Sequence, residues 1–397
     1  MIDGLQSVVI VGGGISGLTT ALSLANVGIH SVVLERNLSE VDVGAGIQLS
    51  PNATRIFHQI GLERDLAEIG RTPSTMEWLD GETDQRIASF PISSYVKANF
   101  DAPYLQLYRP ELIRTLERAC SIDERIELRK GVAVEALRLH ADSVVIETST
   151  GDIRADLCVG ADGTNSTVRR NLSNSFDYGR FAGFAYRTTI PLTQLNNEFA
   201  QNLTRLWLNS RFHVVTYPVG AEPVLNCVFV VESDDAEIPE DMHRQKSSRK
   251  SLSKTIDSPS ALLGTLLERV SEDSLFRWPL FQFPPVRVRQ LGEYPLALVG
   301  DAWHTTLPFA GQGAALAIED AITLARSLSE LRLGTLASRL SIFETMRIPR
   351  VCQVQRISAR NRTVYHLGNP VLKRLRNWGA QFAYRRTTER LFSYENM

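Results

Sequence analysis

The sequence predicts a mixed α/β fold with α+β parts: a Rossmann-like dinucleotide-binding domain, an inserted β-sheet domain and a C-terminal helical segment. Three observations support this prediction. A glycine-rich turn joins an apolar strand to a helix within "VVIVGGGISGLTTALSLANVGIHSVVLER", residues 8–36. Strand-rich stretches then interrupt the elements that would complete such a domain. Finally, the chain from about residue 341 onward has a mostly helical, basic pattern.

Composition limits the class of protein before any motif is considered. The 397 residues exceed one ordinary domain and suit two packed domains, and 43% are apolar. The formal net charge of -1 argues against a nucleic-acid partner. No signal pattern or long apolar run is present, so we expect a cytoplasmic protein. Four widely spaced cysteines make a disulfide framework or zinc site improbable and suit a reducing compartment: Cys120, Cys158, Cys227 and Cys352.

The first βαβ unit carries a dinucleotide-binding pattern. We expect a strand at 8–11, a helix at 16–27 and a strand at 31–34. Gly12 permits the tight turn, Gly14 lets backbone approach a pyrophosphate, and Gly17 lets helix and strand pack closely. Glu35 ends the second strand, where a carboxylate accepts hydrogen bonds from ribose hydroxyls and repels a 2′-phosphate. The pattern therefore predicts FAD or NAD, with Arg36 either near the adenosine or a surface arginine.

The remaining elements follow from periodicity and turn residues. Residues 44–69 begin as a loop and become an amphipathic helix from about Pro51. Arg109 stands between a strand and a helix, with Pro110 at a favourable first helical position. Further expected elements are a β-meander ending in a buried strand at 157–159, strands over 184–231, a mobile connection at 233–260, a helix at 260–270, and a strand, loop and long helix over 294–331.

Two more motifs stand in order along the chain. They are "GADGTNSTVR" at 160–169 and "GDAWHTTLPFAGQGAALAIEDA" at 300–321. Together with the first glycines and "LYRPELIRTL", they resemble the single-component FAD-dependent aromatic hydroxylases, the salicylate hydroxylase and p-hydroxybenzoate hydroxylase family. The resemblance covers nearly the whole chain. It implies bound FAD, a transient NADH or NADPH co-substrate, and dioxygen.

The resemblance also implies residue roles. The first three glycines and Glu35 would hold the ADP half of FAD, and Asp301 would accept hydrogen bonds from the ribityl chain. The other residues expected at the cofactor are Arg109, Asp162, Gly163, Pro308, Gly311, Gln312 and Gly313. Alternatives stay open: Asp162 can be a simple turn residue and Asp301 a helix-loop cap. Independently of the family, a helix beginning near Gly313 would turn its positive end toward a reduced, negatively charged flavin.

The resemblance implies a reaction and a division of the chain. NAD(P)H reduces FAD, dioxygen gives a flavin C4a-hydroperoxide, and its terminal oxygen passes to a small aromatic or heteroaromatic ring. A second GxGxxG for NAD(P)H is missing, which fits transient binding and leaves NADH against NADPH open. We expect an FAD-binding domain from 1–70, 100–175 and 285–340, a substrate-binding sheet domain from 71–99 and 176–284, and C-terminal helices over 341–397.

The segment "LWLNSRFHVVTYPVG" is the candidate substrate wall. His213, Val215 and Tyr217 share one face of an extended strand. Resemblance to salicylate-hydroxylase-like enzymes places this segment by the substrate, with His213 as general base or phenol partner and Tyr217 orienting the ring. Gln48 and Pro308 are expected to touch the substrate too. The alternatives are a sheet histidine with satisfied hydrogen bonds and a core tyrosine.

Other histidines are given no catalytic part. His304 is expected to pack structurally, and no metal-binding spacing is present. The histidines expected at the surface are His30, His58, His140, His243 and His366.

The basic C-terminal segment carries an apolar stripe. Val371, Leu375, Trp378 and Phe382 fall on one helix face, and Gly379 is expected to interrupt the helix. We favour docking of this face on its own domain or on a dimer partner over a membrane, so a monomer or homodimer is expected. Two rival functions remain: a hydroxylase of a prenylated quinone precursor at the membrane, and a non-hydroxylating FAD-binding redox protein.

Overall fold

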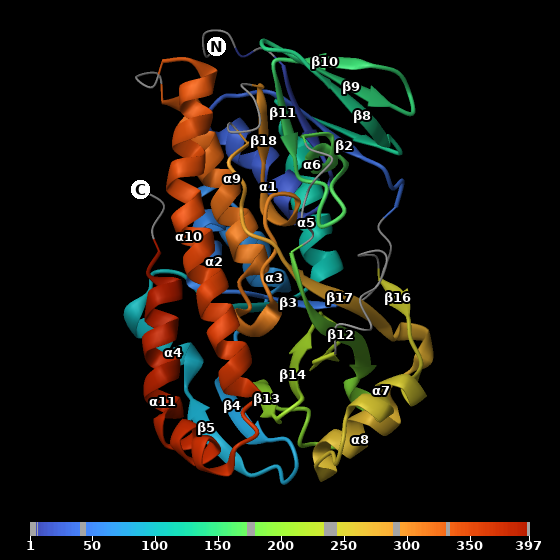
Figure 1. The fold of residues 1–397 in the computed structure, drawn as a ribbon, viewed down its shortest axis with the longest axis vertical. Helices are drawn as coiled ribbons and strands as arrows, with labels where there is room; N and C mark the ends of the chain where they lie inside the picture. Colours follow the sequence, from blue (N-terminus) through green and yellow to red (C-terminus); the bar gives the residue numbers. More distant parts are fainter. Residues whose placement is uncertain are drawn as a thin grey trace.

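The computed structural model describes residues 5, 7–39, 45–172, 179–233, 244–288, 294–330 and 334–394. It has a parallel-sheet half and a second half built on a larger mixed sheet, with long C-terminal helices along one side (Figure 1). The predicted mixed α/β class is therefore confirmed. The sequence boundaries assigned above to the domains stay a prediction.

The first half contains a five-stranded parallel sheet in the order β18-β11-β1-β2-β7. Its strands β1, β11 and β18 are buried on both faces, as parallel strands covered by helices are, whereas the edge strand β7 is partly exposed. Their bounds are β1 Val8–Val11, β2 Ser31–Glu35, β7 Ile126–Lys130, β11 Leu157–Gly160 and β18 Leu296–Leu298. Helix α1 (Ile15–Asn26) packs between α5 (Arg109–Ile122) and α9 (Gly313–Ser329). The first βαβ unit thus agrees with its prediction to within one residue at each boundary.

Smaller elements surround this sheet. The predicted meander forms an antiparallel sheet in the order β10-β9-β8, beside α6. A two-stranded sheet of β3 and β6 leads toward the second half, and α2 starts at Pro51 as predicted. The bounds are β3 Gly46–Leu49, α2 Pro51–Gln59, α3 Glu63–Ile69, β6 Leu105–Tyr108, β8 Val134–Leu139, β9 Val144–Thr148, β10 Ile153–Ala155 and α6 Thr167–Leu172.

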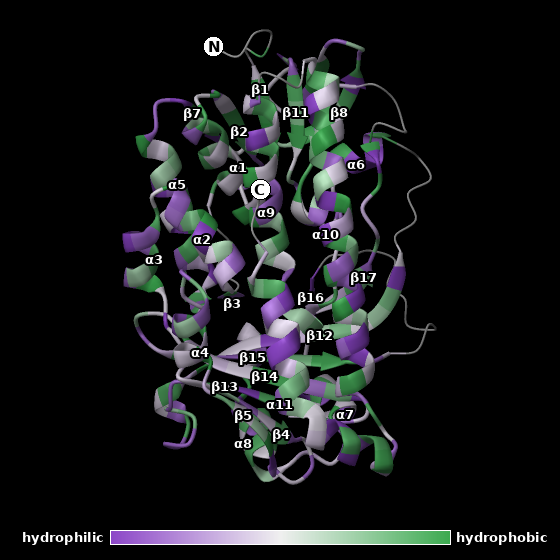
Figure 2. Ribbon diagram, turned by 90° about the vertical axis from the view of Figure 1, so that its left-hand side faces the viewer, coloured by the Kyte–Doolittle hydropathy of each residue, from purple (hydrophilic) through white to green (hydrophobic). Residues whose placement is uncertain are grey.

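The second half is an eight-stranded sheet in the order β16-β17-β12-β15-β14-β13-β4-β5. Helices α7 and α8 cover one face, where Phe212 and Val214 of β14 join a large apolar cluster. The strands are β4 Thr75–Asp80, β5 Arg86–Phe90, β12 Arg180–Pro191, β13 Leu203–Leu208, β14 Phe212–Val219, β15 Val224–Val231, β16 Gln245–Lys246 and β17 Phe276–Gln282. The short helices are α4 Ile92–Asn99, α7 Arg249–Thr255 and α8 Ala261–Arg269. In Figure 2 the strands β1 and β11 of the parallel sheet are coloured largely as hydrophobic.

The other face of this sheet meets the C-terminal helices. Helix α10 (Leu336–Tyr365) runs from the first half into the second, and α11 (Pro370–Phe392) lies against β4 and β5 (Figure 1). Glu319 and Asp320 of α9 are fully buried against Arg347 and Arg350 of α10. Arg347 lies 2.7 Å from Asp320 and 2.9 Å from Glu319, which ties the two helices together.

Three expectations about local structure were wrong. The connection at 233–260 contains helix α7, because Ser248 caps it and Leu252 is buried; residues 234–243 lie outside the described part. Gly379 does not interrupt α11, since one glycine costs a helix only about 1 kcal/mol. The stripe Val371, Leu375, Trp378 and Phe382 does not dock on its own domain, since these side chains are 59–89% exposed. The other expected arrangement, docking on a dimer partner, stays a prediction. None of the helices in the described ranges is long and apolar enough to cross a membrane.

Candidate functional site

The first turn has the geometry that its three glycines predict. Gly12 has φ of +110°, a conformation that favours glycine. A Cβ on Gly17 would stand 1.8 Å from the Gly12 carbonyl oxygen, so helix and strand approach too closely for any side chain. A Cβ on Gly14 would meet no atom within 4 Å. Since Gly14 also caps α1 without a side-chain hydrogen bond, the helix end faces open space.

This open space fits the phosphates of FAD. Helix N-termini supply N–H donors and partial positive charge to anions. Added Cβ atoms would likewise meet nothing within 4 Å at Gly163, and only Thr306 at 3.8 Å from Gly313. The hydroxyl of Thr306 is buried without a hydrogen-bond partner. A cradle of bare glycines with an unpartnered donor is what a large polar cofactor requires.

Glu35 is held beside this cradle. Its Oε2 accepts a hydrogen bond from the Gly13 N–H at 2.8 Å, and its Oε1 accepts from the backbone N–H of Asn37 at 2.8 Å. The side chain is half-buried, so it can accept further bonds from a ribose. Arg36 is exposed.

Asp301 lies in the short 3-10 turn Gly300–Ala302 that follows β18. Burial raises the pKa of its carboxyl, although His304, Arg187 and Arg109 lower it. The residue is nevertheless exposed, so it faces a recess and not packed protein. Arg187, on β12, was missed by the sequence analysis because no motif marks it. Its Nε is buried without a hydrogen-bond partner, and burial lowers the pKa of its guanidinium.

Asp162 caps a helix. Its carboxylate accepts hydrogen bonds from the hydroxyl of Ser166 at 2.5 Å and from the backbone N–H of Thr167 at 2.6 Å, at the start of α6. Burial raises the pKa of the Asp162 carboxyl, while the hydrogen bonds from Ser166 and the helix backbone lower it. The capping bonds agree with the structural alternative. A role of Asp162 toward FAD stays a prediction.

The third motif forms a loop that ends at α9. Pro308–Ala310 is a single 3-10 turn, Gly311 has φ of +61°, and α9 begins at Gly313 without a side-chain cap. Gln312 is buried and donates a hydrogen bond to the hydroxyl of Ser50 at 2.9 Å. Gln48 lies across from Gly311, and its Nε2 is buried without a partner. The helix end predicted for the flavin is present and open.

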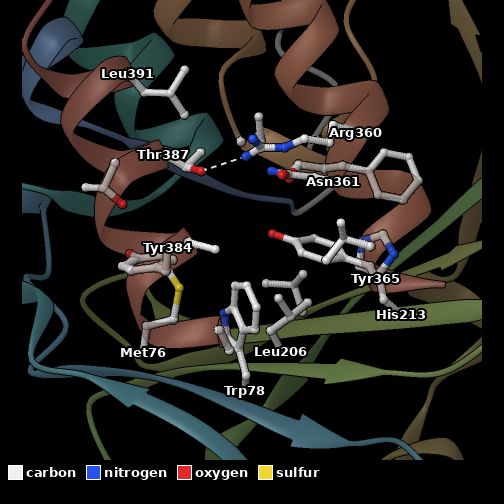
Figure 3. Close-up of a pocket in the computed structure, with 18 of the residues that line it drawn as sticks. Met76, Trp78, Leu206, His213, Arg360, Asn361, Tyr365, Tyr384, Thr387 and Leu391 are labelled. Atoms are coloured by element: carbon white, nitrogen blue, oxygen red, sulfur yellow. Dashed lines mark hydrogen bonds between the residues drawn. The ribbon is translucent and has the colours of Figure 1, made fainter. Parts of the chain in front are cut away.

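A cavity of about 540 Å³ begins at this loop. Figure 3 shows Tyr365 pointing into it, with His213 beside Tyr365 and with Met76, Trp78 and Leu206 forming its floor. Of the predicted substrate residues, Gln48, His213 and Pro308 line the cavity. Residues that sequence reasoning missed are Met76, Trp78, Tyr104, Leu206, Arg360, Asn361, Tyr365, Arg376 and Tyr384.

Tyr217 is placed apart from the cavity wall. It is buried beside Gly46, where a Cβ would come within 2.6 Å of its ring, and next to Arg187. Burial raises the pKa of Tyr217, and the positive charge of Arg187 lowers it. His213 and Tyr217 do share one strand face, but only His213 is among the cavity residues. The substrate role predicted for Tyr217 stays a prediction.

His213 is buried and paired with a second histidine. Only 2% of it is exposed, and its Nδ1 lies 3.0 Å from Nε2 of His366 at the end of α10. Burial, and next the charge of His366, lower the pKa of His213 well below its ordinary value. The surface position expected for His366 is wrong: its side chain is 3% exposed. The pairing joins residues 153 apart in sequence, so no local pattern could predict it.

None of the other described histidines lines the cavity. His304 is buried and bonded to Asp320 at 2.8 Å, as expected of a packing residue. His30 and His140 are exposed and His58 is half-buried, while His243 lies outside the described residues.

Comparisons with known proteins agree with this geometry. Residues 6–358 match the model of a family described as "FAD binding domain". The chain is 32% identical to 3-amino-4-hydroxybenzoate 2-monooxygenase of Streptomyces cremeus, over 92% of this chain and 89% of that protein. It is 30% identical to 3-hydroxybenzoate 6-hydroxylase 1 of Aquipseudomonas alcaligenes, over 89% and 88%. A salicylate hydroxylase in complex with substrate has the same fold, with a TM-score of 0.79, 22% identity, and coverage of 99% and 97%.

Proposed function

The chain belongs to the FAD binding domain family and is an FAD-dependent aromatic monooxygenase, and we propose that its substrate is a small hydroxylated aromatic or heteroaromatic acid. The observation that carries the proposal is the position of His213, whose imidazole lines an apolar cavity that adjoins the Gly311 loop. Two of its relatives are named for hydroxybenzoates.

The glycine cradle would hold FAD in this proposal. Gly12, Gly14 and Gly17 shape the phosphate site, and Glu35 accepts hydrogen bonds from ribose. Asp301 in the recess would bind the ribityl chain. Arg109, Arg36, Asp162 and Gly163 are assigned to the cofactor side, and Pro308, Gly311, Gln312 and Gly313 to the flavin edge. The bound flavin, reduced by NADH or NADPH, supplies oxygen activated from dioxygen.

The cavity residues would prepare the ring for oxygen transfer. A phenolate is more electron-rich than a phenol, so removing the hydroxyl proton favours attack on an electrophilic oxygen. His213 is neutral near pH 7, because its pKa is lowered, and can accept that proton. Arg360 donates a hydrogen bond to the hydroxyl of Thr387 at 2.9 Å, lies across the cavity from Trp78 and Leu206, and would pair with a substrate carboxylate (Figure 3).

Apolar side chains would keep water from the reacting atoms. Trp78, Met76 and Leu206 contribute this surface, and Trp78 contacts Tyr365 edge to face, with ring centroids 5.5 Å apart. Exclusion of water would strengthen electrostatic contacts in the cavity and limit side reactions with water.

Consumption of NADH and NADPH by the FAD-loaded protein tests the proposal. The panel contains hydroxybenzoates, aminohydroxybenzoates, hydroxypyridine carboxylates and the same rings without the carboxylate. We expect faster consumption and a hydroxylated product with at least one acid, and a weaker response to its decarboxylated analogue. An equal rate with the decarboxylated analogue would reject the proposal that the enzyme recognises a substrate carboxylate. No response to any ring, with FAD bound, would favour a non-hydroxylating redox protein.

Two variants separate cofactor binding from chemistry. Asp301→Ala is expected to lose bound FAD, seen as loss of flavin absorbance after gel filtration. His213→Ala should keep FAD and lose hydroxylation by about 100-fold, the scale of general-base catalysis. Normal turnover by His213→Ala would remove this residue from the mechanism.

One observation favours a second substrate class. Leu372 and Leu375 of α11 line the cavity and are also 46% and 59% exposed, so the cavity opens beside an apolar, basic helix face. A prenylated quinone precursor could enter there from a membrane. Binding of the protein to vesicles with anionic lipids, together with turnover of a prenylated phenol and none of the acids, would establish this alternative.

A further inference from the structure

We infer that Glu232 and His366 fix the tautomer of His213 so that its Nε2 presents a free lone pair to the cavity. When His213 accepts a proton, His366 takes up the positive charge beside the carboxylate of Glu232. This inference rests on the proposed function, in which His213 meets the substrate hydroxyl. Glu232 and His366 are positioning residues here, because neither lines the cavity.

The three side chains form a continuous series. His213 Nδ1 lies 3.0 Å from His366 Nε2, and His366 Nδ1 lies 3.0 Å from Glu232 Oε1. The second contact is at ion-pair distance but outside ideal hydrogen-bond geometry. Glu232 also accepts a hydrogen bond from Arg362 Nε at 2.8 Å. The series runs from the buried His213 to a carboxylate that is 35% exposed.

The ionised carboxylate of Glu232 determines which ring nitrogens of His366 and His213 carry protons. Although burial opposes ionisation, His366 and Arg362 lower the pKa of Glu232 to about 2, so it is an acceptor at neutral pH. In the neutral form of His366, the Nδ1 proton is directed toward Glu232 and Nε2 accepts. His213 then donates its Nδ1 proton to His366, which leaves its Nε2 unprotonated. That Nε2 has no hydrogen bond to the described residues and is not sealed off by them.

The proton transfer can now be written in full. The substrate O–H bond breaks, its electron pair stays on oxygen as a phenolate, and the proton forms a bond to His213 Nε2. The Nδ1 proton of His213 crosses to His366 Nε2. The positive charge then rests on His366, beside the carboxylate of Glu232. This placement costs less than an imidazolium held among apolar side chains, as the lowered pKa of His213 indicates.

Other titratable groups near His213 do not replace this series. From α10, Tyr365 packs 5.5 Å from the His213 ring, and from α11 Tyr384 faces the cavity; burial raises the pKa of both phenols, so they stay neutral at pH 5–8. Arg360 and Arg376 contribute fixed positive charge, which disfavours an imidazolium. Phe309 of the flavin loop is uncharged. Glu232 is the one carboxylate of the described chain within ion-pair distance of the histidine pair.

The tautomer can be measured without turnover. Protein labelled with ¹⁵N-histidine and loaded with FAD gives nitrogen shifts that distinguish the two neutral tautomers, and His213→Gln and His366→Gln assign the signals. We expect His213 protonated at Nδ1 throughout pH 6–8, and a mixture of tautomers in Glu232→Gln. Protonation of His213 at Nε2 in the unaltered protein would overturn the inference, as would an unchanged signal in Glu232→Gln. This readout stands even if no substrate is turned over.

Kinetics supply the second test once a substrate is found. Glu232→Gln should lower kcat about tenfold with little change in KM, a smaller effect than the hundredfold or more of losing the base itself. Loss of the carboxylate also makes the histidine pair harder to protonate, so the acidic limb of the pH profile should move to lower pH. Glu124→Gln and His140→Gln, both exposed, are the matched controls and should match the unaltered protein. If Glu232→Gln retains FAD and has a lower kcat, but the acidic limb of its pH profile does not move, the role of Glu232 is only structural.

Discussion

At the scale of single residues, two glycines three positions apart face opposite surroundings. The space beyond Gly14 is open, whereas a Cβ on Gly17 would collide with the carbonyl oxygen of Gly12. One glycine is therefore required by the ligand and the other by the packing of α1 on β1. Within one motif, glycine thus serves two purposes: it leaves open space at position 14 and permits close packing of helix and strand at position 17.

Alanine substitutions should separate these demands. Without FAD, Gly17→Ala should destabilise the protein by about 1–3 kcal/mol, the usual cost of overpacking, while Gly14→Ala should change stability by less than about 0.5 kcal/mol. Gly14→Ala should instead weaken FAD binding, because its methyl group enters the phosphate space. Urea unfolding of the apoprotein and FAD titration measure the two effects. Equal destabilisation by both variants would show that the Gly14 space is filled by protein.

At the scale of elements, α9 and α10 are joined by charges with no access to solvent. Arg347 has no exposed surface, and its guanidinium contacts both Glu319 and Asp320. Asp320 also accepts hydrogen bonds from His304 at 2.8 Å and from the Gly300 N–H at 2.9 Å. The cluster therefore connects helix α10 to Gly300 and His304, in the segment that precedes the predicted flavin loop.

Removal of this arginine should be costly. Arg347→Leu removes the arginine that both buried carboxylates share, although Glu319 keeps Arg350 and Asp320 keeps His304. We expect a loss of about 3 kcal/mol in unfolding free energy. Arg138→Leu is the matched control, because its pairs with Glu147 and Asp152 are exposed and should contribute less than about 1 kcal/mol. Urea unfolding of both variants at pH 7 checks the difference. A small effect of Arg347→Leu would mean that the carboxylates are protonated or hydrated.

Elements were predictable where their signals are local. The first βαβ unit could be placed because the glycine spacing and the apolar runs lie within 29 residues. Helix α7 was missed because its sequence is rich in serine and lysine and has no apolar repeat. Its one buried residue, Leu252, packs against side chains that are distant in sequence. His366 was misplaced for the same reason. The burial of His366 depends on the strands β14 and β15, which are distant in sequence. No pattern in the residues near His366 predicts a buried partner.

At the scale of the whole molecule, α11 has one face in the cavity and the other in solvent. Its inner face contributes Ala380 and Tyr384, while Trp378 and Phe382 are 89% and 72% exposed. Our expectation that the stripe docks on its own domain failed because helical periodicity locates an apolar face but does not say which of two faces is used.

Substitution of the outer face should leave the fold intact. Trp378→Gln combined with Phe382→Gln should change the unfolding free energy by less than about 0.5 kcal/mol. Leu391→Ala, on the buried face, is the control and should cost about 2–5 kcal/mol. Thermal unfolding at two protein concentrations, with light scattering, checks both. A large, concentration-dependent loss in the double variant would indicate that a second copy covers this face.

The path of the chain around the cavity has a consequence for how such enzymes diversify. The glycine cradle is built from residues before 36 and from the loop near 300, whereas α11 begins at Pro370, beyond the stretch that matches the family model. One wall of the cavity, which includes Ala380 and Tyr384, is thus encoded apart from the glycine cradle. Exchange of the C-terminal segment during evolution would therefore alter this wall of the cavity, and with it the substrate range, while the glycines of the cradle stay unchanged.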